Sequence, residues 1–390
     1  MNRIGLFSAV VLLALMVVAL LAPLIANDLP LKVKYEGNSY YPALAVYFGQ
    51  EGSGQVETPS GREALNYQRY DWQSQAWDEI VMPVIPFAPD ELDASNSSLV
   101  KPGTNGHLLG TDRVGRDVMA GLIHGARISL SIGWIAMGIA ALIGVLLGAI
   151  SGFYGNNSWR VSKVSFWVFW FTLPIGWFYA QHMRIGSLAF TLPLTVIIPL
   201  TFSWLVGKTP FLGKQTMNVP IDGIITRITE ILTSLPRLLI IITVASITSK
   251  SIWMVMVIIG LTSWTNIARY TRAEILRIRS LDYIAAAEAA GLRKRKILAN
   301  HAIPNALAPV WVDIAFGIAS AILIESGLSF LGIGVPVDTV TWGSMLNLGR
   351  LNFEAWWLVV FPGIAIFITV TAYNILGESL RKWLQPKERF

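Results

Sequence analysis

The sequence predicts an all-α protein that crosses a membrane several times. Of its 390 residues, 54% are hydrophobic and only 14% are charged, whereas a soluble globular domain carries nearer a quarter charged residues. Several apolar runs reach the roughly 20 residues that a helix needs to cross a bilayer. The chain also holds 33 Gly and 15 Trp. Small residues let membrane helices approach closely, and aromatic residues favour the membrane interface.

Eight apolar runs are the candidate spans. The first lies within residues 1–26, and we expect it to be a retained N-terminal anchor. A cleaved signal peptide is the alternative, but the run is long and lacks a small-x-small cleavage pattern. The other runs lie at 128–151, 164–180, 188–206, 224–247, 252–273, 309–332 and 356–376.

Two of these runs belong to a Pro-interrupted hairpin at about 157–221. Because 164–180 is short for a span, the hairpin either crosses the membrane or re-enters from one side. We therefore expect six core helices plus this hairpin, about eight spans. The second span continues into Gly144, Gly148 and Gly152, whose spacing of four predicts a groove for a closely packed helix.

The distribution of charge predicts the orientation. Between 27 and 125 there are seven Lys or Arg and thirteen Asp or Glu, whereas 269–300 holds eight basic residues and three acidic ones. Positive residues collect on the cytoplasmic side of a membrane. We therefore expect 27–125 to be extracytoplasmic, and the N-terminus, the 269–304 loop and the tail at 381–390 to be cytoplasmic. The transmembrane domain then covers 126–380.

The cytoplasmic loop at about 274–304 has the pattern of a short helix, a glycine and a basic turn. An alanine run at 285–287 favours helix, Ser280 or Asp282 is a candidate cap, and Gly291 suits the left-handed residue after a helix end. A helix fixed between two spans can pass a partner's movement into the membrane. The alternative is an ordinary basic, Ala-rich loop without a special role.

At this point the chain resembles the inner-membrane permeases of the dipeptide, oligopeptide and nickel class of bacterial ABC importers. The loop signature of that family is Glu-Ala-Ala, three residues, Gly, nine residues and Ile-x-Leu-Pro. Ala285 replaces the signature Glu, and Glu288 is out of register. The resemblance implies contact with an ATPase through Tyr283, Ala285, Ala286, Ala287, Gly291, Arg293, His301 and Pro304.

Other stretches match the same family. An extracytoplasmic signature before the second span holds Gly110, Asp112, Gly115, Arg116 and Asp117, and Arg272 and Glu274 match the helix before the loop. Residues 325–332, 342–346 and 361–363 match the final third. The start of the long outer segment, at 25–30, resembles the branch that imports microcin-like peptides. Together the matches cover roughly 105–155 and 222–386.

The resemblance implies the fold of a type I importer permease and a role as half of a peptide pathway working by alternating access. The implied partners are a homologous second permease, two ATP-binding cassette subunits that use the ATP, an extracytoplasmic solute-binding protein and membrane lipid, with no nucleic acid. The location is the inner membrane. Import of nickel or another small solute is the alternative, and a non-transporting scaffold is a third.

No motif predicts an enzyme, a bound cofactor or a metal site in this chain. Residues 207–209 (Gly-Lys-Thr) end like a phosphate-binding loop, but Phe202 stands where the first glycine is needed. Ionisable residues inside spans are costly in hydrocarbon and mark candidate pathway or gating positions. Four residues qualify: Glu230, Arg237, Asp313 and Glu325. Glu230 and Arg237 are seven apart, which predicts one shared helix face. Pairing with neighbouring helices is the alternative for all four.

Overall fold

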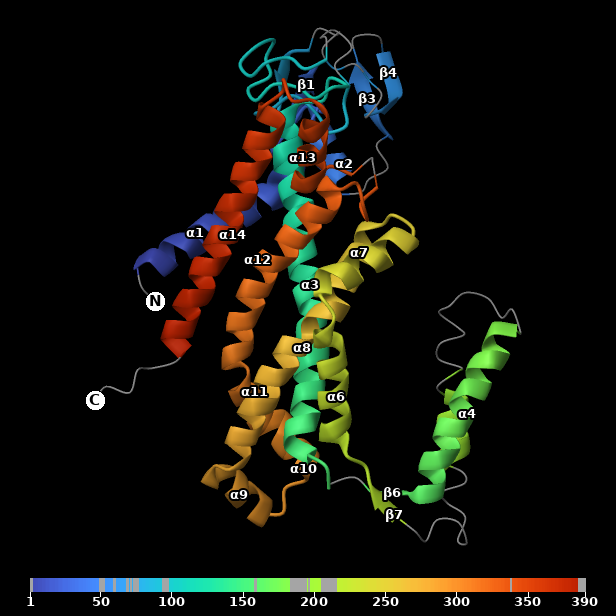
Figure 1. Ribbon diagram of the computed structural model, residues 1–390. Helices are drawn as coiled ribbons and strands as arrows, with labels where there is room; N and C mark the ends of the chain where they lie inside the picture. Colours follow the sequence, from blue (N-terminus) through green and yellow to red (C-terminus); the bar gives the residue numbers. More distant parts are fainter. Residues whose placement is uncertain are drawn as a thin grey trace. The chain divides into compact units, whose positions relative to one another are not determined.

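The computed structural model describes residues 3–48, 53–58, 61–67, 70, 72, 77–92, 98–157, 160–182, 195, 197–204, 216–336 and 339–384. Long helices dominate, and the strands are short (Figure 1). The chain divides into two compact units, each described by itself. One comprises Met1–Gly144, Thr233–Ile267 and Leu307–Phe390, and the other comprises Val145–Leu232 and Ala268–Ala306.

Five helices in the described part of the chain are long and apolar enough to cross a membrane. They are α1 (Arg3–Ile25), α3 (Val118–Tyr154), α8 (Ile252–Arg279), α12 (Ala308–Phe330) and α14 (Trp357–Leu384). The predicted helical membrane fold is therefore confirmed. The helix α3 begins eight residues before the expected start at 126, and α14 continues into the expected tail.

The predicted count of about eight spans is not confirmed, because the described residues provide five spans, or six if α6 and α7 together form one. The difference lies in the hairpin. Its first helix, α4 (Lys163–His182), has polar ends that leave an apolar run shorter than the roughly 20 residues of a span. Much of the run at 188–206 lies outside the described residues.

The single helix expected at 224–247 is broken into α6 (Ile221–Ser234) and α7 (Arg237–Ile247). The break falls at Leu235 and Pro236, because proline disfavours helical geometry in the residue before it and has no N–H for the helix. Glu230 therefore lies on α6 and Arg237 on α7. The prediction that these two residues share one helix face is wrong.

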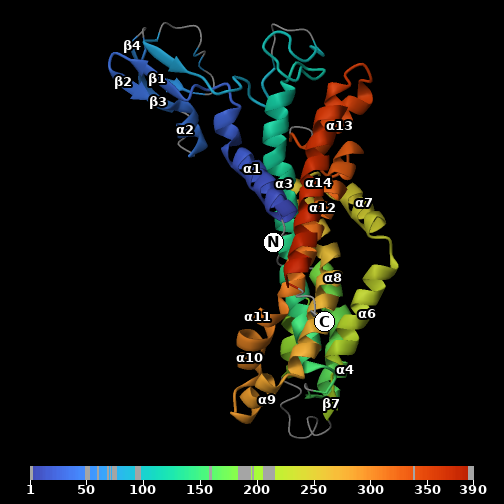
Figure 2. The same cartoon turned by 90° about the vertical axis from the view of Figure 1, so that its left-hand side faces the viewer.

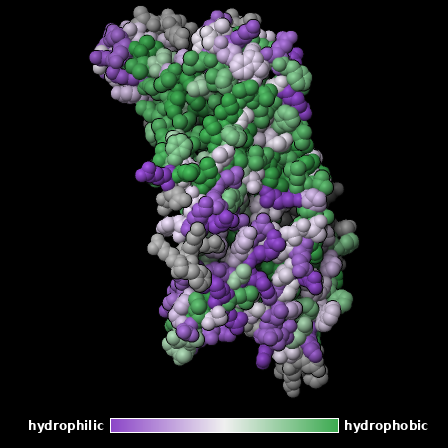
Figure 3. Space-filling model, turned by 60° about the vertical axis from the view of Figure 1, so that its left-hand side comes forward, coloured by the Kyte–Doolittle hydropathy of each residue, from purple (hydrophilic) through white to green (hydrophobic). Residues whose placement is uncertain are grey.

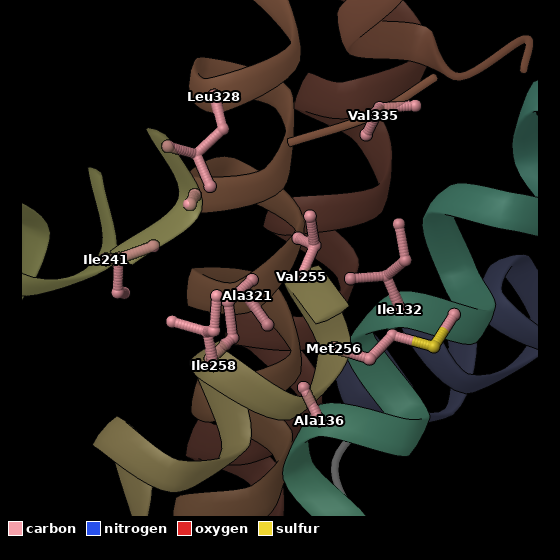
Figure 4. Packing of buried hydrophobic residues seen from close by; sticks show 11 residues of the cluster. Ile132, Ala136, Ile241, Val255, Met256, Ile258, Ala321, Leu328 and Val335 are labelled. Carbon is pink, nitrogen blue, oxygen red and sulfur yellow. The ribbon is translucent and has the colours of Figure 1, made fainter. Parts of the chain in front are cut away.

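The core of the first unit is an apolar cluster between four helices. Ile132 and Ala136 of α3, Ile241 of α7, Val255 and Met256 of α8, and Ala321 and Leu328 of α12 point toward one another (Figure 4). In the same unit, α14 packs against α1, α12 and α13 (Trp342–Leu351), as both ribbon views show (Figures 1 and 2).

Apolar side chains of the first unit also face outward. Figure 3 turns α1 and α14 toward the viewer and shows hydrophobic residues gathered across this face. The exposed apolar residues of α1 and α14 include Leu6, Phe7, Leu13, Leu20, Ile364 and Phe367, all at least 48% exposed. An apolar area of this kind is stable in lipid and costly in water, as a membrane span requires.

The segment expected to be extracytoplasmic contains strands that were not predicted from the sequence. β1 (Lys32–Tyr35) lies between β2 (Asn38–Tyr40) and β5 (Glu79–Val81) in an antiparallel sheet, and β3 (Ser53–Thr58) pairs with β4 (Gly61–Asn66). A short helix, α2 (Pro42–Tyr47), follows β2. Lys32 Nζ lies 2.8 Å from Glu79 Oε2 across the sheet. This hydrogen bond raises the pKa of Lys32 and lowers the pKa of Glu79.

Two strands in the second unit bring the ends of the inserted hairpin together. β6 (Arg160–Ser162) pairs antiparallel with β7 (Thr216–Asn218). The hairpin therefore begins after α3 and ends before α6 at neighbouring positions. Such closure lets a long insertion extend from a fold without disturbing the helices on either side of it.

The glycines of α3 form the predicted groove, and α8 lies in it. A Cβ on Gly144 would meet Ile267, one on Gly148 would meet the carbonyl oxygen of Ala268, and one on Gly152 would meet the carbonyl oxygen of Arg272. Each pair lies within one unit. Because these contacts are with backbone or β-branched side chains, the groove has no room for a larger residue.

Candidate functional site: the segment between α8 and α12

The predicted coupling loop folds into a compact helical segment, Asp282–Ala306. It consists of α9 (Asp282–Ala289), α10 (Lys294–Ile297), a π-helical turn at Leu298–Ala302 and α11 (Ile303–Ala306). The expected order of short helix, glycine, basic turn and proline is thus present. Its role in contacting a partner stays a prediction.

Gly291 ends α9 in the way its position predicts. Its φ is +76°, the Gly291 N–H donates to the Glu288 carbonyl, and the Leu292 N–H donates to the Ala287 carbonyl. This is a Schellman arrangement, which satisfies the last carbonyls of a helix. The predicted start is wrong, because the cap position is Leu281 and no side chain caps α9. The Ser280 hydroxyl donates instead to the carbonyl of Arg277.

An apolar cluster holds the segment against the ends of α3 and α8. Ile284 of α9, Ile297 of α10 and Ala306 of α11 are buried against Ile275 and Ile278 of α8. Phe153 of α3 belongs to the same cluster, and Ala287 packs on its edge. The segment and the last turns of α8 therefore form one packed body inside the second unit.

The opposite face of α9 is exposed and carries small side chains. Ala285, Ala286, Ala289 and Ala290 are exposed, and Tyr283 is 42% exposed beside them. The basic turn follows, with Arg293 through Lys296 all exposed. A smooth surface bordered by cations has the shape and charge to meet a groove on a partner protein.

A proline near the end of the segment shapes the turn before it. Pro304 has no N–H to donate to the carbonyl four residues earlier, and the wider π-turn at Leu298–Ala302 lies directly before α11. His301 is half-buried in that turn, its carbonyl accepts a hydrogen bond from Asn305 Nδ2 at 2.7 Å, and Pro304 is exposed.

Replacing Gly291 by alanine is expected to cost about 1–2 kcal/mol of local stability, because an L residue pays this strain in a left-handed conformation. A Cβ there would have nothing within 4 Å, so the effect is conformational and not steric. Gly291→Asn is the control, because asparagine tolerates this region. Hydrogen exchange of the α9 amides measures the difference, and equal protection in both variants would contradict it.

The signature that we expect on the extracytoplasmic side forms a closed turn ahead of α3. Asp112 accepts hydrogen bonds from the N–H groups of Val114 and Arg116, and its other oxygen lies 2.8 Å from Arg116 Nε. Gly110 and Gly115 have φ of +81° and +89°. A Cβ on Gly110 would meet the carbonyl oxygen of Val100 at 2.5 Å. Asp112, Arg116 and Asp117 also line a cavity of about 130 Å³.

Asp117 caps α3 and holds a buried histidine. One of its oxygens accepts from the Ala120 N–H at 2.7 Å, and the other lies 2.8 Å from His107 Nδ1. Asp117→Ala is expected to cost about 1–2 kcal/mol through loss of the cap, plus the cost of losing the buried contact with His107 Nδ1. The melting temperature in detergent measures the loss. Asp117→Asn, which keeps the cap acceptor, should recover part of it, and no difference between the two would contradict the cap.

The four ionisable residues expected in spans have different surroundings. Glu230 is exposed on α6 and pairs with Arg227 at 2.7 Å. Arg237 of α7 interacts electrostatically with Asp313 of α12. Glu325 of α12 is fully buried; the hydroxyls of Ser329 and Ser129 lie 2.7 Å and 3.4 Å from its carboxylate.

The sequence did not predict an ion pair that lies in the same unit as the Asp282–Ala306 segment. Asp222 of α6 and Arg272 of α8 meet through two hydrogen bonds. The available signal was that Asp222 and Arg272 lie near the ends of apolar runs, where charges are kept only with a partner or a role. The partner could not be assigned, because fifty residues separate the two in sequence. Residues 207–209 lie outside the described residues.

Comparison with known proteins gives a consistent result. The family described as "Binding-protein-dependent transport system inner membrane component" matches residues 211–390. The inner membrane ABC transporter permease protein YejE of Escherichia coli is 27% identical over 99% of this chain and 94% of its own. The oligopeptide transport system permease protein OppC of Bacillus subtilis is 30% identical over 78% of this chain and 81% of its own.

Other matches have similar descriptions. A putative peptide permease protein of Brucella suis is 30% identical over 78% of this chain and 80% of its own. Among solved structures, the inward-facing MetNI methionine ABC transporter covers 68% of this chain and 97% of its own, at 13% identity and a TM-score of 0.43. That structural likeness is too weak to place individual elements.

Proposed function

Because this chain belongs to the family of binding-protein-dependent transport system inner-membrane components, we propose that it forms half of an ATP-driven import pathway for peptides. It is a multi-pass protein of the inner membrane. The solute class is inferred from the 30% identity to an oligopeptide permease, which extends over four fifths of the length of that relative. The dipeptide permease of Bacillus subtilis is 28% identical over 74% of this chain.

Membership of this family implies a binding protein and an ATPase as partners. We propose the fuller complex of two permeases, two ATPases and one extracytoplasmic binding protein, with both termini of this chain in the cytoplasm. In this complex the chain binds no nucleotide, and the Asp282–Ala306 segment docks on an ATPase. The exposed alanine face of α9 and the basic turn support that contact.

The mechanism follows from how the segment is held. Ile284 and Ile297 pack it onto the last turns of α8, and a packed body moves as a unit because its interior is close to solid density. ATP-driven closure of the ATPases then displaces the segment and α8 together. Alternating access requires this kind of rigid-body displacement on one side of the membrane.

The solute class is tested on the reconstituted complex. The binding protein, both permeases and the ATPases are purified, and the solute retained by the binding protein is identified by mass spectrometry. We expect peptides of a few residues, and uptake of a labelled peptide into proteoliposomes that requires both ATP and the binding protein. Retention of Ni²⁺ or of a non-peptide solute, with no peptide uptake, would contradict the proposal.

A further inference from the structure

Asp222 and Arg272 form a two-pronged ion pair between α6 and α8. Arg272 Nε lies 2.5 Å from Asp222 Oδ1, and Arg272 Nη2 lies 2.7 Å from Asp222 Oδ2. The Ser151 hydroxyl of α3 donates to the same carboxylate. The side chains of Asp222 and Arg272 are 17% and 36% exposed. A fork-to-fork pair fixes direction as well as distance, which a single contact does not.

Arg272 belongs to the body that carries the Asp282–Ala306 segment. It lies three residues before Ile275, which is fully buried in the cluster with Ile284 and Ile297. The helix α8 continues without a break to Arg279, two residues before the cap of α9. Any displacement of the segment therefore moves the Arg272 guanidinium with it.

Few side chains of the helix α6 are buried. Only Ile221 and Thr229 are buried among its fourteen residues. At its first turn, the Asn156 side chain accepts from the Gly223 N–H at 2.9 Å, directly beside Asp222. The contacts to Asp222 and Gly223 in its N-terminal turn thus come from α3, α8 and the residues after α3. The chain continues from α6 through Leu235 and Pro236 into α7.

From this arrangement we propose that the Asp222–Arg272 pair transmits displacement of the Asp282–Ala306 segment to α6, and through the chain to α7. The two residues are positioning residues for transport and touch neither solute nor ATP. The proposal rests on the proposed function, because it takes the segment to be the contact with the ATPase. It assigns a role to residues that no loop motif includes.

A purely structural role for the pair makes a different prediction. If Asp222 and Arg272 only stabilise the fold, their loss lowers the amount of assembled complex, and uptake and ATP hydrolysis fall together. If the pair transmits movement, the assembled complex still hydrolyses ATP but moves less solute for each ATP. The ratio of peptide taken up to ATP hydrolysed therefore separates the two roles.

The experiment compares four full-length variants in the reconstituted complex: Asp222→Asn, Arg272→Gln, the exchanged pair Asp222→Arg with Arg272→Asp, and Arg227→Gln. Arg227 is the matched control, because it lies on α6 in an exposed ion pair with 81% of its side chain accessible. Peptide uptake, ATP hydrolysis with and without the binding protein, and complex yield are measured for each.

We expect the single variants to keep basal ATP hydrolysis and to lose at least about tenfold in the uptake-to-ATP ratio. The exchanged pair should recover most of the ratio, and Arg227→Gln should match the unsubstituted chain. An unchanged ratio in the single variants overturns the proposal. A second result also overturns the proposal. In it the single variants fail to assemble, and the exchanged pair assembles with the same uptake-to-ATP ratio as the unsubstituted chain.

The design keeps the two proposals apart. A complex with the unsubstituted chain that takes up no peptide contradicts the proposed solute. In that case the stimulation of ATP hydrolysis by the binding protein still tests the role of the Asp222–Arg272 pair. The reason is that the signal passes from the binding protein to the ATPases through the permease. Loss of stimulation in Asp222→Asn, with basal hydrolysis retained, is the supporting result, and retained stimulation overturns the role of the pair.

Discussion

An arginine in place of Ala286 is expected to abolish most ATP-driven uptake while leaving this subunit folded in the membrane. Ala286 lies two residues from the buried Ile284, which places it on the opposite face of α9 at 100° per residue. The new side chain therefore points away from its own fold and into any docked partner. A bulky charge in a close-packed contact costs a few kcal/mol, so we expect uptake to fall at least about tenfold.

The measurement is uptake in proteoliposomes, together with ATP hydrolysis and the amount of assembled complex. Ala286→Ser is the matched control, because it adds one hydroxyl at the same position and should leave uptake near its original rate. Ala287 is a poorer position for this test, since it is half-buried and packs against the cluster under α9. Full uptake with Ala286→Arg in a normally assembled complex would show that this face does not dock.

The second large effect is expected at the glycine groove. Gly148→Leu should destabilise the protein by about 1–3 kcal/mol, because overpacking forces helices or side chains out of place. A Cβ at Gly148 would collide with the Ala268 carbonyl oxygen and would lie 2.9 Å from Thr271 Cβ. Neither atom is the end of a flexible side chain, so α3 and α8 must separate.

Gly138→Leu on the same helix is the control for Gly148→Leu. Gly138 is exposed, and a Cβ there would have nothing within 4 Å. Leucine is a strong helix former, so both substitutions improve helix propensity equally. Thermal unfolding in detergent, followed by size-exclusion chromatography, should show a lower transition for Gly148→Leu alone. Equal transitions for the two variants would contradict a tight helix contact at Gly148.

The sequence prediction failed in two places, once where a local signal was outweighed and once where the missing information was long-range. Pro236 was visible inside the run 224–247, but the length of that run favoured one span over two shorter helices. The pairing of β1 with β5 joins residues more than forty apart, and short polar strands carry little apolar alternation from which to predict them. The strand pairing does not follow from the composition of its own segments, whereas the break at Pro236 has a local cause that the length of the run outweighed.

The sequence by itself determined the features whose cause is local. Apolar runs of about 20 residues require lipid or a protein interior, glycines at every fourth position leave a groove, and Gly291 suits a left-handed helix end. Tertiary structure alone decided which face of α9 is exposed, that Asp222 meets Arg272, and that Glu325 is buried among hydroxyls. The physical reason is that local conformation depends on neighbouring residues, whereas burial and ion pairing depend on helices brought together from distant parts of the chain.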